Sequence, residues 1–394
     1  MDRMASIVLR DVGGLGDALE AECWASEVVS TWSGRETADG DGEQIFLPAF
    51  VRALERKASR NALAMLRALG AVGGDSHRKR ARSAGDRLAA RGLGEPPWSD
   101  QLGRFKPIAA ALVCDEAFDD GVSLFVEFGA DAGVRHTLGI YVDHNLGGLV
   151  KDVLVAGALS EVRSTLGARA HDGASLGVRE LDLSEARARI EAALYMLDHT
   201  YDPPVDEDVG SLRALLDART RTLPEGFELP DPYEELSSEQ REQLLADFLA
   251  SPEGERWRRD EDAEDVVSAA IDFGADYNHG GPLRWSPVVV EIFMTSWLAR
   301  KVARGLSFFT RVPEVLPDWV RYAGRVRGVP RELLSDAVDA VGEFRDEMLE
   351  TVDNPEAWGP AKMFAVAAQS EGVDLADLDA LNAFIERYNA GLAA

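Results

Sequence analysis

Two aspartates near the middle of the chain have the spacing most suited to chemistry. Asp143 and Asp152 flank the dipeptide Gly147-Gly148. If the glycines form a two-residue hairpin turn, the strand register places the two carboxylates opposite each other. Opposed carboxylates repel, so they need water, a cation, a basic neighbour or a raised pKa. They could bind a metal that activates water for hydrolysis, or they could form a solvated hairpin tip relieved by Lys151. A longer loop with a different register is a third interpretation.

Three other residues complete the candidate catalytic set. His144 follows Asp143 directly, and strand alternation places it on the opposite face, so the two side chains could share a metal only at a frayed strand end. We therefore expect His144 to be a hydrogen-bonded edge residue. His199 lies at the end of a predicted helix, where it should interact with helix-terminal carbonyl groups. Glu127, on a neighbouring predicted strand, is the third residue.

A second group of polar and aromatic side chains surrounds the tripeptide Gly280-Gly281-Pro282. Loops between helices often carry binding groups. The same loop could instead be an ordered corner in which the tryptophan packs and the arginine pairs locally. The candidate binding residues are Tyr277, Asn278, His279, Arg284 and Trp285.

Common enzymatic motifs are absent from the sequence. It contains no phosphate-binding loop ending in Gly-Lys-Ser/Thr, no nucleophile elbow around a serine and no His-Glu-x-x-His helix. The two cysteines, Cys23 and Cys114, lie far apart and form neither a disulfide framework nor a metal-ligand pair. The sequence thus identifies no cofactor, and whether the protein is an enzyme is left open.

The charge is strongly acidic but uneven. The formal net charge is −27, which argues against broad binding to nucleic acid or to anionic membranes. Residues 52–91 nevertheless carry 11 Lys and Arg against 3 acids, and residues 300–331 carry 8 against 2. Residues 202–265 carry 20 acids against 7 bases. We expect these surfaces to face each other or a second copy, with nucleic acid on the basic segment 78–91 as an alternative.

The elements that must position these residues follow from hydrophobic periodicity. Three- and four-residue spacing predicts helices over 46–69 and 76–90. Alternation then predicts a four-stranded antiparallel meander over 108–114, 122–128, 137–142 and 149–155, covered by helices over 160–166 and 184–199. Prolines surround one acidic helix in 201–236, and helical patterns follow over 238–249, 263–273, 288–303, 318–327, 331–352, 360–370 and 376–390.

The predicted fold class is therefore α+β and predominantly helical. N-terminal helices precede a small four-stranded antiparallel sheet, and a C-terminal all-α bundle follows. We expect an N-terminal helical segment over 1–98, an α+β domain over 99–200, an acidic proline-rich connector over 201–236 and a helical domain over 237–394. No strand is expected after Ser237.

One charged residue interrupts an otherwise apolar helix. Glu291 lies within the run from Val288 to Leu298, where apolar residues point in nearly every direction. Such a helix should be buried, and a buried carboxylate needs a partner. We therefore predict that Glu291 is buried and paired, with Arg284 as the nearest candidate.

The sequence favours a multidomain cytoplasmic protein with a noncatalytic binding or regulatory function. It shows no secretory signal, and its longest apolar run is about half of the roughly 20 residues that a membrane span requires. The expected partner is a protein, which includes self-association, whereas nucleic acid and membrane are not expected. The alternatives are a metal-assisted hydrolytic enzyme that uses Asp143 and Asp152, and a nucleic-acid-associated protein that uses the basic N-terminal helices.

Overall fold

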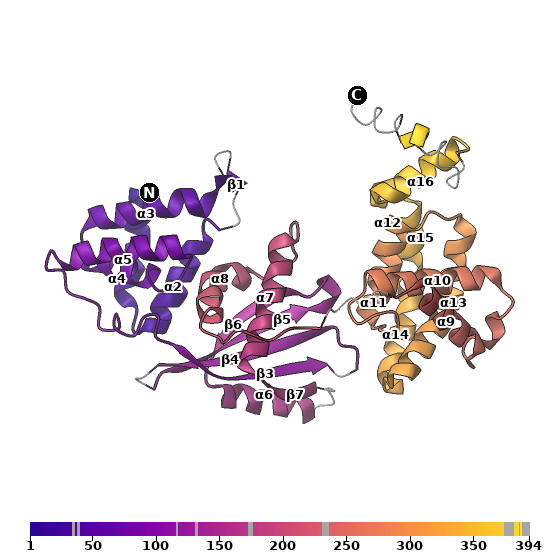
Figure 1. Ribbon diagram of the computed structural model, residues 1–394, viewed down its shortest axis with the longest axis horizontal. Coiled ribbons are helices and arrows are strands. Elements are labelled where there is room, and N and C mark those ends of the chain that lie inside the picture. Colours follow the sequence, from indigo (N-terminus) through magenta and orange to yellow (C-terminus); the bar gives the residue numbers. More distant parts are fainter. Residues whose placement is uncertain are drawn as a thin grey trace. The chain divides into compact units, whose positions relative to one another are not determined.

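The chain forms two compact units. The computed structural model describes residues 1–33, 36–37, 40–115, 117–130, 133–171, 176–230, 236–373, 382–385 and 387 (Figure 1). The first unit comprises Met1–Glu116 and Gly121–Pro230, and the second comprises Ala117–Asp120 and Asp231–Ala394. Four residues between two strands of the first unit therefore belong to the second.

The first unit begins with five helices. They are α1 (Asp2–Asp11), α2 (Ala18–Ser30), α3 (Gly42–Lys57), α4 (Arg60–Leu69) and α5 (Asp75–Ala89), with a short turn η1 (Val12–Gly14) after α1. The predicted helix over 76–90 is confirmed as α5. The single helix predicted over 46–69 is wrong, because α3 and α4 are separate. Ala58 takes a left-handed backbone (φ 44°), and the Ser59 side chain caps α4 by accepting a hydrogen bond from the Ala62 N–H.

A five-stranded antiparallel sheet follows, in the order β6-β5-β4-β3-β7. Its strands are β3 (Lys106–Asp115), β4 (Gly121–Gly129), β5 (Arg135–Asp143), β6 (Leu149–Ala156) and β7 (Leu176–Leu181). The four predicted strands are confirmed, but the prediction missed β7. This edge strand carries Arg179 and Glu180, and charged residues of this kind protect an exposed sheet edge from pairing with another chain. They also interrupt the alternation of apolar residues from which a strand is predicted. A two-stranded sheet of β1 (Glu36–Thr37) and β2 (Gly40–Asp41) was also not predicted.

Helices cover both faces of the five-stranded sheet (Figure 1). The helix α6 (Leu159–His171) packs on one face through a small cluster that includes Phe125 and Leu159. The larger core lies on the other face, where α7 (Leu183–His199), α8 (Glu207–Thr220) and α2 pack. Because Leu215 and Leu216 of α8 are fully buried, the acidic helix that was predicted inside a connector is part of this core.

The second unit is helical around its own core, which includes Phe248, Phe293 and Trp319. No strand occurs among its described residues after 236, as predicted. Its elements are α9 (Ser238–Ala250), η3 (Glu255–Trp257), α10 (Glu261–Asp276), α11 (Pro287–Glu291), the π-helical segment η4 (Ile292–Trp297), α12 (Leu298–Lys301), α13 (Leu306–Arg327), α14 (Arg331–Glu343), α15 (Arg345–Asp353), η5 (Pro355–Ala357) and α16 (Pro360–Ser370).

Two helices in the second unit differ from the prediction. The helix predicted to start at Asp318 begins at Leu306 and continues through Pro313 and Pro317. The long helix predicted over 331–352 is divided between α14 and α15 at Phe344. The helix predicted over 376–390 lies mostly outside the described residues. Within the part of the chain that is described, no helix is long and apolar enough to cross a membrane.

Candidate functional site

The two central aspartates are not opposite each other. In the β5–β6 register, Asp143 pairs with Leu149 and Asp152 pairs with Tyr141. The predicted two-residue turn is wrong, because a short helical turn η2 (His144–Leu146) precedes the two glycines and lengthens the connection. After a register shift in β6, Asp152 lies opposite Tyr141, two residues before Asp143 on β5.

Each aspartate has its own surroundings. Asp143 is 5% exposed; it accepts hydrogen bonds from the Lys151 ammonium at 2.8 Å and from the Asn145 N–H at 2.9 Å. It therefore caps the turn and pairs with a base, as an ordinary structural aspartate does. The pKa of Asp152 is raised, first by partial burial and then by the negative charge of Asp206. The strand register thus separates the two residues on which the hydrolytic hypothesis depended.

The other candidate catalytic residues have structural partners. Glu127 is buried, and its carboxylate accepts a hydrogen bond at 3.3 Å from the N–H of Leu159, the first residue of α6. His199 is exposed, and its Nδ1 lies 2.7 Å from the Tyr195 carbonyl oxygen, which confirms the predicted contact with a helix-terminal carbonyl. His144 is 8% exposed and lies in the turn after β5.

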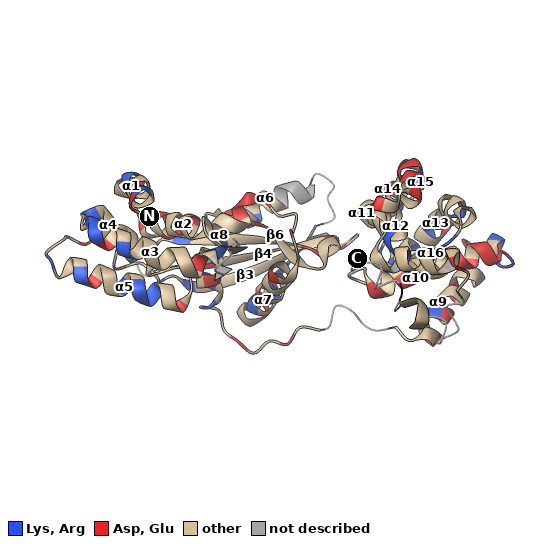
Figure 2. Cartoon of the chain, turned by 90° about the horizontal axis from the view of Figure 1, so that it is seen from above, with Lys and Arg blue, Asp and Glu red and all other residues tan. Residues whose placement is uncertain are grey.

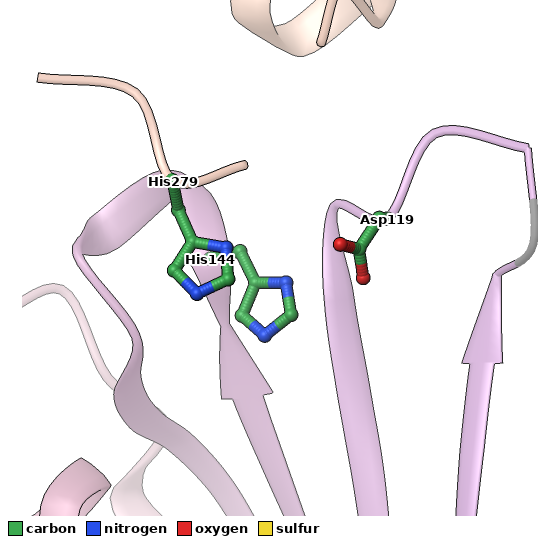
Figure 3. Close-up of side chains that lie close together, drawn as sticks. All are labelled: Asp119, His144 and His279. Atoms are coloured by element: carbon green, nitrogen blue, oxygen red, sulfur yellow. The ribbon is translucent and has the colours of Figure 1, made fainter. Parts of the chain in front are cut away.

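Three side chains near the ends of these elements are drawn in Figure 3. Asp119 precedes β4, His144 follows β5, and His279 lies in the loop between α10 and α11. His144 belongs to the first unit, whereas Asp119 and His279 belong to the second. The three side chains therefore do not define a site within either unit.

The loop between α10 and α11 is an ordered corner built around Arg284. This side chain is 1% exposed and donates to the Asn278 side-chain oxygen at 2.6 Å, to the Asp120 carboxylate at 2.8 Å and to the His279 carbonyl oxygen. The same Asp120 oxygen accepts a hydrogen bond from Ser286 at 2.7 Å. A buried guanidinium with this many acceptors is held in place, so it is not poised to bind a ligand.

The aromatic residues of this loop also have packing roles. Trp285 is 3% exposed, contacts Phe273 and Phe293, and donates its indole N–H to the Pro282 carbonyl oxygen at 2.7 Å. Tyr277 is 49% exposed, with the Lys301 ammonium 5.0 Å from the centre of its ring. Of the two interpretations of the loop, these contacts favour the ordered corner.

A buried polar cluster in the first unit was missed by the sequence analysis. Arg219 donates to the Glu22 carboxylate at 2.5 Å and to His136 Nε2 at 3.1 Å, and all three residues are at most 3% exposed. The pKa of His136 is lowered to about 3, first by burial and then by the positive charge of Arg219. Strand alternation could have indicated this burial, because His136 shares the face of Leu138 and Ile140.

Glu291 is exposed, so the prediction that it is buried and paired with Arg284 is wrong. Arg284 pairs with Asp120 instead. The helix that carries Glu291 is not covered on every side, since Val288, one turn earlier, is 40% exposed. The apolar residues of this helix therefore lie partly in the core and partly on an exposed surface.

A groove of about 330 Å³ runs along this surface, between α11 and α14. Apolar groups line part of it, and its other lining residues are all acidic. They are Pro287, Val288, Ala340 and Phe344 together with Glu291, Asp336, Asp339 and Glu343. A groove that combines apolar and anionic groups is suited to a cationic ligand that also has an apolar part.

The acids of α14 form a stripe along one face of the helix. Glu332, Asp336, Asp339 and Glu343 follow at spacings of four, three and four residues, and all four are exposed. None of them, nor Glu291, makes an ion pair with any residue that the structure describes. Figure 2 shows the acidic residues of α14 and α15. Like charges at this spacing destabilise a helix by a few tenths of a kcal/mol per pair, roughly 0.2 to 0.5.

The helix α5 is rich in basic residues (Figure 2), and two of its arginines pair with carboxylates. Arg78 pairs with Asp75, and Arg87 pairs with Glu55 at 2.6 Å. The guanidinium of Arg82 donates to the Gly70 carbonyl oxygen at 2.7 Å. Lys79 and Arg80 are exposed and make no ion pair with a residue that the structure describes.

Comparison of the chain with protein-family models, with curated proteins and with solved structures gives no match.

Proposed function

We propose that this protein is a noncatalytic binding protein whose second unit receives a cationic, partly apolar segment of a partner protein. The binding surface is the groove between α11 and α14. The observation that carries the proposal is the set of four groove-lining carboxylates, none of which makes an ion pair with a described residue. They lie beside apolar groups, of which Val288 is exposed. A basic amphipathic helix presents the complementary pattern.

The energetic cost of the stripe supports a functional role. Three like-charge pairs along α14 together oppose helix formation by about 1 kcal/mol, and the helix gains no compensating ion pair from them. A cationic partner would reverse the sign of this interaction on binding. Complementary charge would also speed the encounter and select among partners, while the apolar wall would supply buried area.

A synthetic peptide tests the proposal. Its leucines recur at helical spacing between lysines, and the matched control peptide has glutamine in place of lysine. We expect the lysine peptide to bind the full-length protein, with an affinity that falls as salt is added, and the glutamine peptide to bind at least ~tenfold more weakly, or ~1.4 kcal/mol. Fluorescence anisotropy of the labelled peptides measures both affinities.

Two variants of equal net charge distinguish binding in the groove from attraction of the peptide to the overall negative charge of the protein. The double substitution Asp336→Lys and Asp339→Lys reverses two groove charges, whereas Glu239→Lys and Glu242→Lys reverse two exposed charges on α9. Only the groove variant should lose about tenfold or more in affinity for the lysine peptide. Equal losses in the two variants, or equal binding of the two peptides, would show that the groove is not the site.

A further inference from the structure

The segment 300–306, at the connection between α12 and α13, is cationic and partly apolar. It contains three basic residues and no acid. Its backbone leaves the helical conformation after Lys301 and resumes it at Leu306. The Leu306 side chain is 62% exposed. The segment thus has both properties that the groove between α11 and α14 is suited to receive.

The positive charge of this segment is not balanced within the described part of the chain. Arg304 makes one ion pair, with the Asp265 carboxylate at 3.2 Å. Arg300 and Lys301 are exposed, and neither pairs with a carboxylate that the structure describes. The groove is unbalanced in the opposite sense, because four carboxylates and no basic residue line it. The two surfaces are therefore complementary in charge as well as in apolar character.

The groove and the segment lie at opposite ends of one continuous helical stretch. This stretch comprises α11, η4 and α12 and runs from Pro287 to Lys301. Val288, which lines the groove, lies roughly 20 Å along the helix from Lys301, at about 1.5 Å per residue. No residue of the segment lines the groove. The folded chain thus holds the segment away from its own groove, whereas a second copy can supply one.

An exposed strip of the stretch connects its two ends. The exposed residues from the groove to the segment are Val288, Glu291, Ser296 and Arg300, at spacings of three, five and four residues. The five-residue step crosses η4, whose π-helical hydrogen bonds span five residues. The strip therefore stays on one side of the helix and is available along its length to another molecule.

We propose that two copies of this protein associate about a two-fold axis, with the segment 300–306 of each copy in the groove of the other. The inference rests on the proposed function and names a second copy of the chain as the partner. When two such stretches lie antiparallel and side by side, each groove faces the segment of the other copy. The two contacts are identical, so the association closes as a dimer and does not extend into a filament.

Sedimentation velocity of the full-length protein at several salt concentrations tests the proposal. We expect a dimer that dissociates as salt is added, because exposed charges are screened. The lysine peptide should compete for the groove and release monomers. A dimer that the peptide does not dissociate, or a protein that is monomeric at about 100 μM, would overturn the proposal.

The anisotropy experiment measures binding of the lysine peptide separately from self-association. A monomeric protein that binds the lysine peptide in the groove would refute the dimer and leave the proposed function standing. A protein that neither self-associates nor binds the peptide would refute both.

Charge reversals locate the contact. Arg300→Glu with Lys301→Glu reverses two charges of the segment, and Asp336→Lys with Asp339→Lys reverses two charges of the groove. Each variant should self-associate at least about tenfold more weakly than the unmodified protein. An equal mixture of the two should associate more tightly than either alone, because the groove of the first variant and the segment of the second are unchanged. Absence of this recovery would overturn the proposal.

The matched control changes two exposed cations on α5. Lys79→Glu with Arg80→Glu gives the same net charge as the segment variant, but these residues lie in the first unit. The control should therefore self-associate as the unmodified protein does. An equal loss in the control would show that the overall charge, and not the segment 300–306, determines the association, and the proposal would then be wrong.

Discussion

At the scale of single residues, the buried cluster of His136, Arg219 and Glu22 has the clearest dependence on pH. Because Arg219 donates to Nε2 of His136, the ring is neutral, with its proton on Nδ1. Burial holds the folded-state pKa near 3, whereas the unfolded chain takes up a proton at the ordinary value of about 6.5. Between these values the unfolded state binds one more proton, so the protein loses stability as the pH falls.

The substitution His136→Gln should remove this pH dependence, since glutamine keeps an acceptor for Arg219 and does not titrate. Between pH 7 and pH 5, the free energy of unfolding of the first unit should fall by about 2 kcal/mol more in the unmodified protein than in the variant. Urea unfolding at the two pH values measures both changes. The same pH dependence in both proteins would mean that His136 is protonated in the folded state.

At the scale of elements, α14 is a helix with two different surfaces. One side borders the acidic groove, and the other borders a cavity of about 620 Å³ whose lining includes both Arg331 and Glu253. Asp339 lies at the edge of both. The apolar residues Ala337, Ala340 and Val341 are buried between these surfaces. The helix thus uses its apolar positions for the core and leaves its charged positions exposed.

Asp339→Lys should make the second unit more stable. The substitution replaces two like-charge pairs, with Asp336 and Glu343, by two attractive pairs on an exposed helix face. The free energy of unfolding should rise by about 0.5 to 1 kcal/mol at low salt and by less at high salt. Thermal or urea unfolding at two salt concentrations measures the effect. A loss of stability would show that Asp339 has a structural role.

Periodicity identified most elements but not their connections. Alternation located β3 to β6, and three- and four-residue spacing located helices such as α5 and α7. The break at Ala58 could not be predicted, because the apolar stripe continues through it and only the backbone changes direction. The β5–β6 register was also missed, since a pair of glycines is compatible with several turn lengths.

The candidate sites were harder to predict than the elements. The ordered corner around Arg284 was one of the two interpretations of the loop between α10 and α11, and the contacts of the structure favour it. Its acceptor Asp120 is distant in sequence, however, so the pairing could not be inferred from spacing. The exposure of Glu291 was missed for a related reason, because composition shows that a helix is apolar but not which neighbours cover it.

At the scale of the whole molecule, the second unit contains four residues from the connection between β3 and β4. Ala117 and Phe118 lie in the core of the second unit, and Asp120 binds Arg284 and Ser286. The three chain segments at 116–117, 120–121 and 230–231 therefore all pass between the two units. The second unit depends on residues that are encoded within the first.

Phe118→Ala should loosen the second unit specifically. Phe118 is 9% exposed, and removal of a buried phenylalanine ring costs about 3 to 5 kcal/mol. Hydrogen exchange followed by mass spectrometry should show faster exchange in α10, α11 and α13, while β5 and β6 keep their protection. If exchange increases only in β3 and β4, Phe118 contributes to the first unit and not to the second.

This arrangement also constrains how the gene can be rearranged. A recombination event that moved only the codons for residues 231–394 would leave the codons for Ala117–Asp120 behind, and Arg284 would lose its carboxylate partner. A C-terminal unit inherited in this way would lack part of its core from the start. Descendants of the gene are therefore expected to keep or lose the two units together.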